Sequence, residues 1–213
     1  MRIIEPSYEI LTEISEGGVK ELQHIEKIGR VCYKSEDKIT EDGESAKKFV
    51  QMLIGRGHEA MIEHSTLSVK FTVDRGVSHE LVRHRIASFA QESTRYCNYS
   101  KDKFDNGITF IRPFFWEEGT EEYSNWEQAM ALAETGYLSA VDMGATPQEA
   151  RSILPNSTKT EITITANYRE WRNFFKLRTA KAAHPQMVQV TRPLLKELKT
   201  RLPIIFDDIE VEE

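Results

Sequence analysis

The sequence predicts an α/β protein of the α+β type, in which a mixed or antiparallel sheet is flanked by helices. Residues 67–73 and 160–166 alternate apolar with polar side chains, as half-buried strands do. Elsewhere apolar residues recur every three or four positions, which is typical of amphipathic helices. The 213 residues contain no internal repeat and no linker-like stretch, so we expect a single domain spanning residues 1–213.

The first third of the chain predicts strands followed by two helices. Residues 1–14 are β-prone and predict one or two strands. A helix over about 18–33 follows, because its apolar residues recur every three positions as far as Val31. Cys32 abuts this stripe and is expected to be a small core residue. A second helix over about 46–54 ends at two glycines, as helix C-termini often do.

The strand at 67–73 carries the clearest alternation in the sequence. A turn at 74–76 is expected after it, and Ser78 is then expected to cap a short helix over 79–85. Three polar residues of that helix would share one face by the i, i+3, i+4 rule: Glu80, Arg83 and His84. Residues 58–64 contain two histidines six positions apart. A helical zinc site needs them four apart, so this segment predicts a loop lining a ligand pocket rather than a metal site.

The second half of the chain predicts six elements in the order strand, helix, helix, strand, helix, helix: residues 108–111, 121–143, 147–154, 160–166, 170–181 and 186–202. The third begins with a capping box, Thr146-Pro147-Gln148-Glu149. Pro193 lies inside the last helix and predicts a bend or a restart there.

The bulk composition excludes several classes of protein. No apolar run approaches the ~20 residues of a membrane span. The formal net charge of −6 and the pI of 5.6 disfavour a general binder of nucleic-acid polymers, whose pI is usually above ~9. The N-terminus has no apolar secretory segment, and two cysteines make no disulfide framework, so we expect a cytoplasmic protein.

The strongest functional signal is a basic and polar run between positions 83 and 96. Arg83, His84 and Arg85 are consecutive, and Arg95 lies ten residues further on. Guanidinium groups bind phosphate in bidentate geometry, whereas amides and hydroxyls suit the edges of a heterocycle. The run therefore fits an anionic, ring-bearing ligand such as a nucleotide. The alternative at this point is a solvated basic turn.

Three separated motifs resemble those of the flavin-dependent thymidylate synthases, over a stretch running from His58 to the His-Pro-Gln at 184–186. The first is Arg-His-Arg at 83–85, followed after seven residues by Ser93 and extended by Arg95 and Tyr96. The second is Arg-Ser-Ile-Leu-Pro at 151–155, which resembles an Ala-Arg-x-x-Leu-Pro segment. The third is Asn-x-Arg-x3-Asn-x4-Arg at 167–178.

The resemblance implies the reductive methylation of dUMP to dTMP. It implies that 5,10-methylenetetrahydrofolate supplies the carbon, that FAD carries the hydride, and that NADPH or NADH supplies the electrons. It also implies a homotetramer whose sites form between subunits.

The resemblance further implies roles for particular residues. The expected nucleotide-binding residues are Glu80, Arg83, Gln91, Glu92, Ser93, Thr94, Arg95, Arg151 and Arg178. The expected flavin-binding residues are His58, Ala60, Arg83, His84, Arg85, Gln91, Asn167, Tyr168, Arg169, Asn173 and His184. Arg178 is the expected catalytic residue. A guanidinium keeps its proton at pH 7, so Arg178 would stabilise a uracil ring deprotonated at N3 rather than act as a base.

Two other interpretations stay open. One is a different flavoenzyme that acts on a pyrimidine nucleotide. The other is a non-catalytic module that binds a nucleotide or RNA through residues 83–95. The acidic overall charge disfavours the RNA version.

Overall fold

The computed structural model describes residues 1–211, and their contacts group into two compact units. The first unit consists of Met1–Tyr8, Lys70–Arg83 and Phe89–Thr163. The second consists of Glu9–Val69, His84–Ser88 and the chain from Ile164 onward. The organisation into a single domain stays a prediction.

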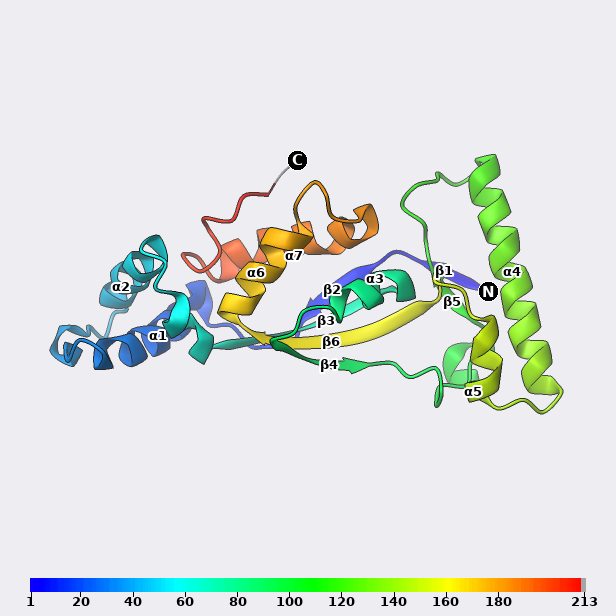
Figure 1. The fold of residues 1–213 in the computed structure, drawn as a ribbon, viewed down its shortest axis with the longest axis horizontal. Coiled ribbons are helices and arrows are strands. Elements are labelled where there is room, and N and C mark those ends of the chain that lie inside the picture. Colours follow the sequence, from blue (N-terminus) through cyan, green and yellow to red (C-terminus); the bar gives the residue numbers. More distant parts are fainter. Residues whose placement is uncertain (212–213) are drawn as a thin grey trace. The chain divides into compact units, whose positions relative to one another are not determined.

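Four strands form the larger sheet (Figure 1). Each strand has residues in both units. In spatial order they are β2 (Ser7–Ile10), β3 (Thr66–Asp74), β6 (Lys159–Asn167) and β4 (Ala87–Gln91). The N–H of Arg75 donates to the carbonyl of Thr158, and the N–H of Tyr168 donates to that of Ser65, so β3 and β6 run antiparallel. The expected α+β class, with a sheet flanked by helices, is confirmed.

The alternation that predicted β3 has the expected cause. Its four apolar side chains are fully buried: Leu67, Val69, Phe71 and Val73. The intervening polar residues are partly exposed. A separate pair of parallel strands, β1 (Arg2–Ile4) and β5 (Thr109–Ile111), lies in the first unit. The protein therefore contains both parallel and antiparallel strand pairs.

The first unit has its core between the long helix α4 (Glu121–Asp142) and strand β5. Buried side chains form this cluster, among them Tyr99, Phe110, Trp126, Met130 and Tyr137. The apolar stripe expected on α4 is therefore a packing face. After α4 comes α5 (Pro147–Ala150), where Thr146 and Glu149 make the predicted capping box.

Helix α3 (Arg75–Leu81) corrects the expectation for this part of the chain. It begins where a turn was expected, because the carboxylate of Asp74 accepts the N–H of Val77 at 2.7 Å and caps the helix. Ser78 lies inside the helix and is not its cap. The helix ends before Arg83, so the shared helical face of Glu80 with Arg83 and His84 is wrong. Strand β4, which follows, was not predicted, because it is short and none of its residues is fully buried.

The second unit contains helices α1 (Val19–Val31), α2 (Glu44–Gly55), α6 (Tyr168–Arg178) and α7 (Pro185–Arg201). Its core includes Leu22, Ile25 and Phe49 from the first two helices and Trp171 and Phe175 from α6. The apolar faces predicted for α1, α2 and α6 are confirmed, except at the C-terminal end of α1.

Several details of the second unit differ from the sequence prediction. Val31 is 54% exposed and Cys32 is exposed, because α1 ends there. The segment Glu59–His64 is a 3-10 helix rather than a loop. Helix α7 continues through Pro193 without a restart. Within residues 1–211, no helix is both long and apolar enough to cross a membrane.

Candidate functional site

The expected site residues fall into two groups, one in each unit. The first unit holds Glu80, Arg83, Gln91, Glu92, Ser93, Thr94, Arg95 and Arg151. The second unit holds His58, Ala60, His84, Arg85, Asn167, Tyr168, Arg169, Asn173, Arg178 and His184. Most expected nucleotide-binding residues are thus in the first group, and most expected flavin-binding residues are in the second.

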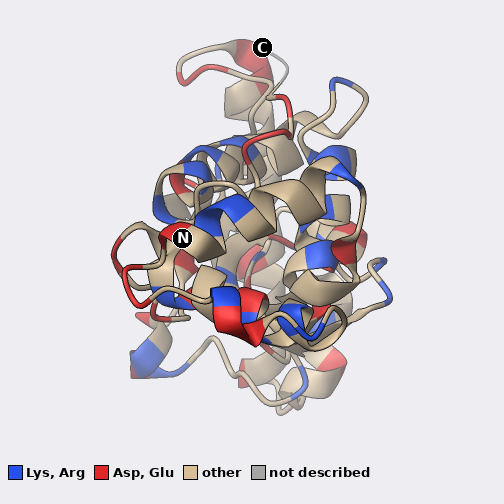
Figure 2. Ribbon diagram, turned by 90° about the vertical axis from the view of Figure 1, so that its left-hand side faces the viewer, with Lys and Arg blue, Asp and Glu red and all other residues tan. Residues whose placement is uncertain are grey.

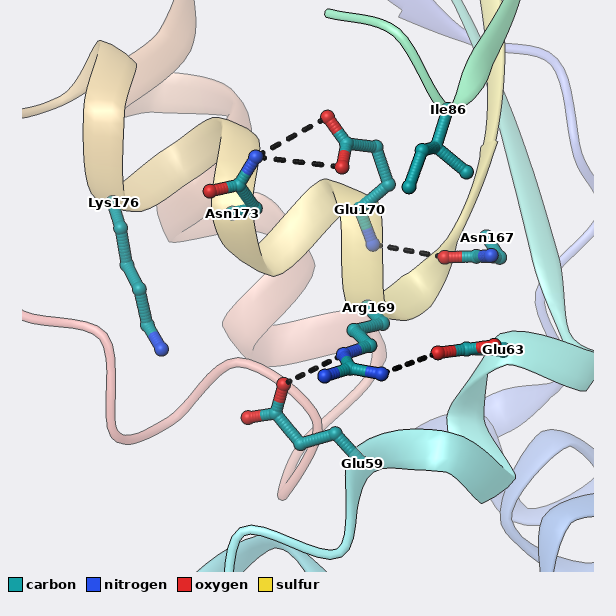
Figure 3. A pocket seen from close by; sticks show the side chains of 8 residues that line it. All are labelled: Glu59, Glu63, Ile86, Asn167, Arg169, Glu170, Asn173 and Lys176. Atoms are coloured by element: carbon teal, nitrogen blue, oxygen red, sulfur yellow. Dashed lines mark hydrogen bonds and ion pairs between the residues drawn. The ribbon is translucent and has the colours of Figure 1, made fainter.

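A hollow of about 490 Å³ opens in the second unit, which is within the usual size range of small-molecule sites (Figure 3). It is lined by Glu59, Glu63, Ile86, Asn167, Arg169, Glu170, Asn173 and Lys176. Three of the expected flavin-binding residues therefore meet here: Asn167, Arg169 and Asn173.

The junction of β6 and α6 explains how these side chains reach the hollow. Asn167 is the last residue of β6, and its side chain accepts the N–H of Glu170 at 2.9 Å, which caps α6. From there Arg169, Asn173 and Lys176 are spaced by four and three residues and so share one helical face. The opposite face carries the buried aromatic residues of the core. One helix thereby separates a polar surface toward the hollow from an apolar surface toward the protein interior.

Tyr168 lies on the interior side of this helix. Its side chain is buried, its ring packs against Phe206 with centroids 6.2 Å apart, and burial raises the pKa of its phenol. A flavin contact by Tyr168 would therefore have to use its backbone.

Carboxylates hold the exposed guanidinium of Arg169 (Figure 3). Its Nη1 lies 2.5 Å from Glu63 Oε1, and its Nε lies 3.8 Å from Glu59 Oε2. The hydrogen bond to Glu63 raises the pKa of Arg169. A bound phosphate would compete with these carboxylates for the same donors.

Arg172 is a structural residue that the sequence analysis missed. Its side chain is only 2% exposed. It donates to the Ile205 carbonyl at 2.5 Å, to Asp208 at 2.6 and 2.7 Å, and to Glu59 at 3.1 Å. These bonds connect the lining residue Glu59 to the C-terminal segment. Periodicity assigns cations to the surface, so no sequence signal pointed to a buried arginine.

The histidine of the Arg-His-Arg motif is buried against helix α6. His84 Nδ1 lies 2.9 Å from Glu170 Oε1, and its Nε2 accepts a hydrogen bond from Arg178 Nε at 3.1 Å. Asn173 Nδ2 lies 3.3 and 3.4 Å from the two Glu170 oxygens (Figure 3). Arg178 is thus connected to the lining of the hollow through His84 and Glu170. Glu170 was not among the expected site residues, although its i, i+3 spacing to Asn173 could have pointed to it.

The polar residues of the first unit are also connected to one another. Gln91 donates through Nε2 to Ser78 Oγ at 2.9 Å and to Thr160 Oγ1 at 3.2 Å. Glu92 accepts from the Tyr99 hydroxyl and from Lys159 Nζ, both at 2.9 Å. These bonds hold the end of β4, where the segment containing Ser93 begins.

That segment turns back toward helix α5. The carbonyl of Ser93 accepts the N–H groups of Tyr96 and Cys97 at 3.1 and 2.9 Å, while Thr94 is buried. Arg95 is exposed and donates through Nε to Gln148 of α5 at 2.9 Å. Arg151 follows Gln148 by three residues, so two guanidinium groups come from adjoining segments. Such a pair suits an anionic group.

The other expected site residues lie on the surface of their units. These exposed residues are His58, Ala60, Arg83, Arg85 and His184. Glu80 is partly exposed at the end of α3. Figure 2 shows that Lys and Arg segments are interspersed with Asp and Glu segments along the chain.

The donor set of the hollow fits part of a flavin dinucleotide. The amides of Asn167 and Asn173 can donate and accept at the edge of a heterocycle, and Arg169 and Lys176 can bind phosphate. Three carboxylates line the same hollow, so an anionic ligand must displace at least those that hold Arg169.

Comparison with known proteins gives consistent family matches. A family model described as thymidylate synthase complementing protein matches residues 19–204. The flavin-dependent thymidylate synthase of Pyrococcus furiosus is 33% identical over 81% of this chain and 70% of its own length. That of Corynebacterium aurimucosum is 32% identical over 93% of this chain and 84% of its own length.

The fold also has a counterpart among solved structures. The UMP/dUMP methylase PolB from Streptomyces cacaoi, bound with 5-Br dUMP, superimposes with a TM-score of 0.77. The alignment covers 97% of this chain and 96% of that chain at 23% identity, so the likeness concerns the fold.

Proposed function

This chain belongs to the family of flavin-dependent thymidylate synthases, which methylate dUMP to dTMP, and we propose that its two groups of polar residues bind the nucleotide and the flavin of that reaction. One observation carries the proposal. Two motifs that lie more than 80 residues apart meet where His84 contacts Glu170 and Arg178 beside the hollow. The solved relative of the same fold, PolB, has 5-Br dUMP bound.

The flavin is FAD, held in the hollow of the second unit. Asn167 and Asn173 bind its ring or ribose edges, and Arg169 and Lys176 bind its phosphates after Arg169 leaves Glu63. The exposed residues Arg83, Arg85, His58, Ala60 and His184 complete its surroundings. The bound flavin supplies hydride chemistry, with electrons from NADPH or NADH and the carbon from 5,10-methylenetetrahydrofolate.

The dUMP phosphate is bound by Arg95 and Arg151, whose side chains start from adjoining segments. Ser93 donates a hydrogen bond to the nucleotide, while Glu80, Arg83 and Thr94 complete the cradle. The side chains of Gln91 and Glu92 are already used in bonds to Ser78, Thr160, Tyr99 and Lys159. They act chiefly by holding the segment that follows β4.

Arg178 faces the uracil ring. Its guanidinium keeps its charge at neutral pH, so it stabilises the ring deprotonated at N3 and does not remove the proton. The negative charge raises electron density at C5, the carbon that becomes methylated. Preorganised charge of this kind usually makes the largest single contribution to stabilising the transition state.

The protein acts in the cytoplasm as a homotetramer whose sites combine residues from different subunits. Support for assembly comes from apolar side chains that flank the motif residues and are exposed in the single chain. Val82, Ile86 and Leu177 are 41%, 68% and 55% exposed, and such side chains near functional residues often mark an interface.

The test is the visible spectrum of the purified protein together with conversion of dUMP. We expect a flavin band close to one per subunit and formation of dTMP when the folate and the reduced nicotinamide are added. A flavin-containing protein that makes no dTMP would support a different flavoenzyme. A colourless protein that takes up no added flavin would support a nucleotide-binding module instead.

A further inference from the structure

Two hydrogen bonds in series connect a carboxylate, an imidazole and a guanidinium in the second unit. Glu170 Oε1 lies 2.9 Å from His84 Nδ1, and His84 Nε2 lies 3.1 Å from Arg178 Nε. Both His84 and Glu170 are nearly buried, with 5% and 10% of their side chains exposed. We propose that Glu170 and His84 position the guanidinium of Arg178, a role that neither residue was expected to have.

The direction of the hydrogen bonds follows from the donors available. The Nε of arginine carries a hydrogen and has no acceptor capacity, so it can only donate. His84 Nε2 must therefore be unprotonated and accept. The single proton of the neutral ring is then on Nδ1, where it is donated to the carboxylate of Glu170. A doubly protonated ring could not accept from Arg178.

Neighbouring residues hold Glu170, His84 and Arg178 in place. The ring of Phe174 packs on that of His84, with centroids 4.9 Å apart. The amide of Asn173 lies against the Glu170 carboxylate at 3.3 and 3.4 Å. The carbonyl of Arg178 accepts the hydroxyl of Thr191 from α7 at 2.8 Å, which holds the backbone at the end of α6.

The functional consequence rests on the proposed role of Arg178 at the uracil ring. A guanidinium is planar, so fixing the direction of its Nε–H also restricts the orientation of its other donors. Electrostatic stabilisation requires donors that are already oriented when charge develops. His84 and Glu170 are therefore positioning residues for the methylation step, and their replacement should affect methylation more than reduction of the flavin.

Two substitutions of His84 separate positioning from simple packing. In His84→Asn the amide nitrogen can replace Nδ1 as donor to Glu170, but nothing replaces the acceptor for Arg178. In His84→Gln the longer side chain can place its carbonyl oxygen near the position of Nε2 and keep that acceptor. His24→Asn, at an exposed position of α1, is the matched control.

Rapid mixing of each variant measures the two half-reactions separately. We expect His84→Asn to slow methylation about tenfold or more, as for loss of one hydrogen bond to a charged group. The rate of flavin reduction should change less than about threefold. The rate of methylation should fall much less in His84→Gln than in His84→Asn. If His84→Gln slowed methylation as much as His84→Asn does, or if only flavin reduction were slowed, the proposal would be overturned. The melting temperatures of the variants show whether a loss of activity is a loss of fold.

Nitrogen NMR of histidine-labelled wild-type protein tests the tautomer without any activity. The signals of His84 are those absent from a His84 variant. We expect one proton, on Nδ1; a proton on Nε2, alone or with Nδ1, would overturn the proposal. A wild-type protein without flavin or dTMP formation would instead contradict the proposed function, and the tautomer would still be measured.

Discussion

At the scale of single residues, the same guanidinium group has three roles in this chain. Arg95 is exposed and donates to an amide, Arg172 is buried in a structural network, and Arg178 donates to a buried histidine that we propose positions it. Arginine suits all three because its donors are fixed in a plane and its charge does not depend on pH near neutrality. The surroundings of each guanidinium therefore decide its role.

Replacing Arg95 by alanine should weaken the binding of dUMP. One charge-assisted contact to phosphate is lost, so we expect the dissociation constant to rise about ten- to a hundredfold. Affinity for the flavin should change far less. Titration calorimetry with each ligand measures both, and Lys101→Ala in the same unit is the control. Unchanged nucleotide affinity would refute the phosphate-binding role.

Replacing Arg178 by lysine keeps a cation but removes the planar set of donors and the bond from Nε to His84. We expect methylation to slow at least about tenfold. Reduction of the flavin needs no uracil anion and should be affected much less. Rapid-mixing measurements of the two half-reactions decide this, and equal losses in both would show that Arg178 does not act on the uracil ring.

At the scale of elements, the β6–α6 junction organises the hollow. The strand ends and the helix begins at Asn167, whose side chain caps the helix. The polar face of α6 lines the hollow, and its apolar face anchors it to the core. The same helix carries Arg172, which connects α6 to Glu59 and to the C-terminal segment.

Replacing Arg172 by methionine should destabilise the second unit. The change leaves the buried Ile205 carbonyl without this donor and removes the ion pairs to Asp208 and Glu59. We expect a loss of about 2–4 kcal/mol at neutral pH, below the upper range for buried pairs because Asp208 is half-exposed. Urea unfolding measures it, and exposed Arg56→Met is the control.

The pH dependence of this loss has a defined sign. The hydrogen bond from Arg172 lowers the pKa of Asp208 below its ordinary 3.8 in the folded protein. The Asp208 contribution is therefore present above the unfolded pKa and is lost as the pH falls through the folded value. The difference in stability between wild type and Arg172→Met should shrink as the pH falls below about 4. A difference independent of pH would contradict the role of Asp208.

At the scale of the whole molecule, the proposed tetramer can be tested by combining two impaired variants in one assembly. Arg95 belongs to the first unit and Arg178 to the second. Where a site takes these two residues from different subunits, coexpressed Arg95→Ala and Arg178→Lys chains form some sites with both residues intact. We expect the mixed tetramers to be more active than either parent.

Sedimentation gives the mass of each sample and shows whether mixed assemblies form. Separately purified Arg95→Ala and Arg178→Lys proteins, combined without subunit exchange, provide the control. A monomer that still turns over would contradict the shared-site model. Mixed tetramers no more active than their parents would do so as well.

Much of the architecture followed from periodicity. The strand around Phe71 and the helix around Trp126 were predicted, since burial of one face imposes the alternation or the three-to-four spacing directly. The start of α3 was not, because Asp74 is a cap only once the chain turns there. Strand β4 was missed because this short edge strand has no fully buried residue, so burial imposes no clear apolar pattern on its sequence.

The sequence by itself determined the family and the identity of the motifs, because the order and spacing of Arg83–Arg85, Ser93 and Asn167–Arg178 are properties of the chain. Only the tertiary structure decided which of these residues touch. Glu170 and His84 are 86 positions apart, and no local rule relates them. Their contact depends on the path of the chain between the two motifs, as does the burial of Arg172, and both are set by packing rather than by sequence distance.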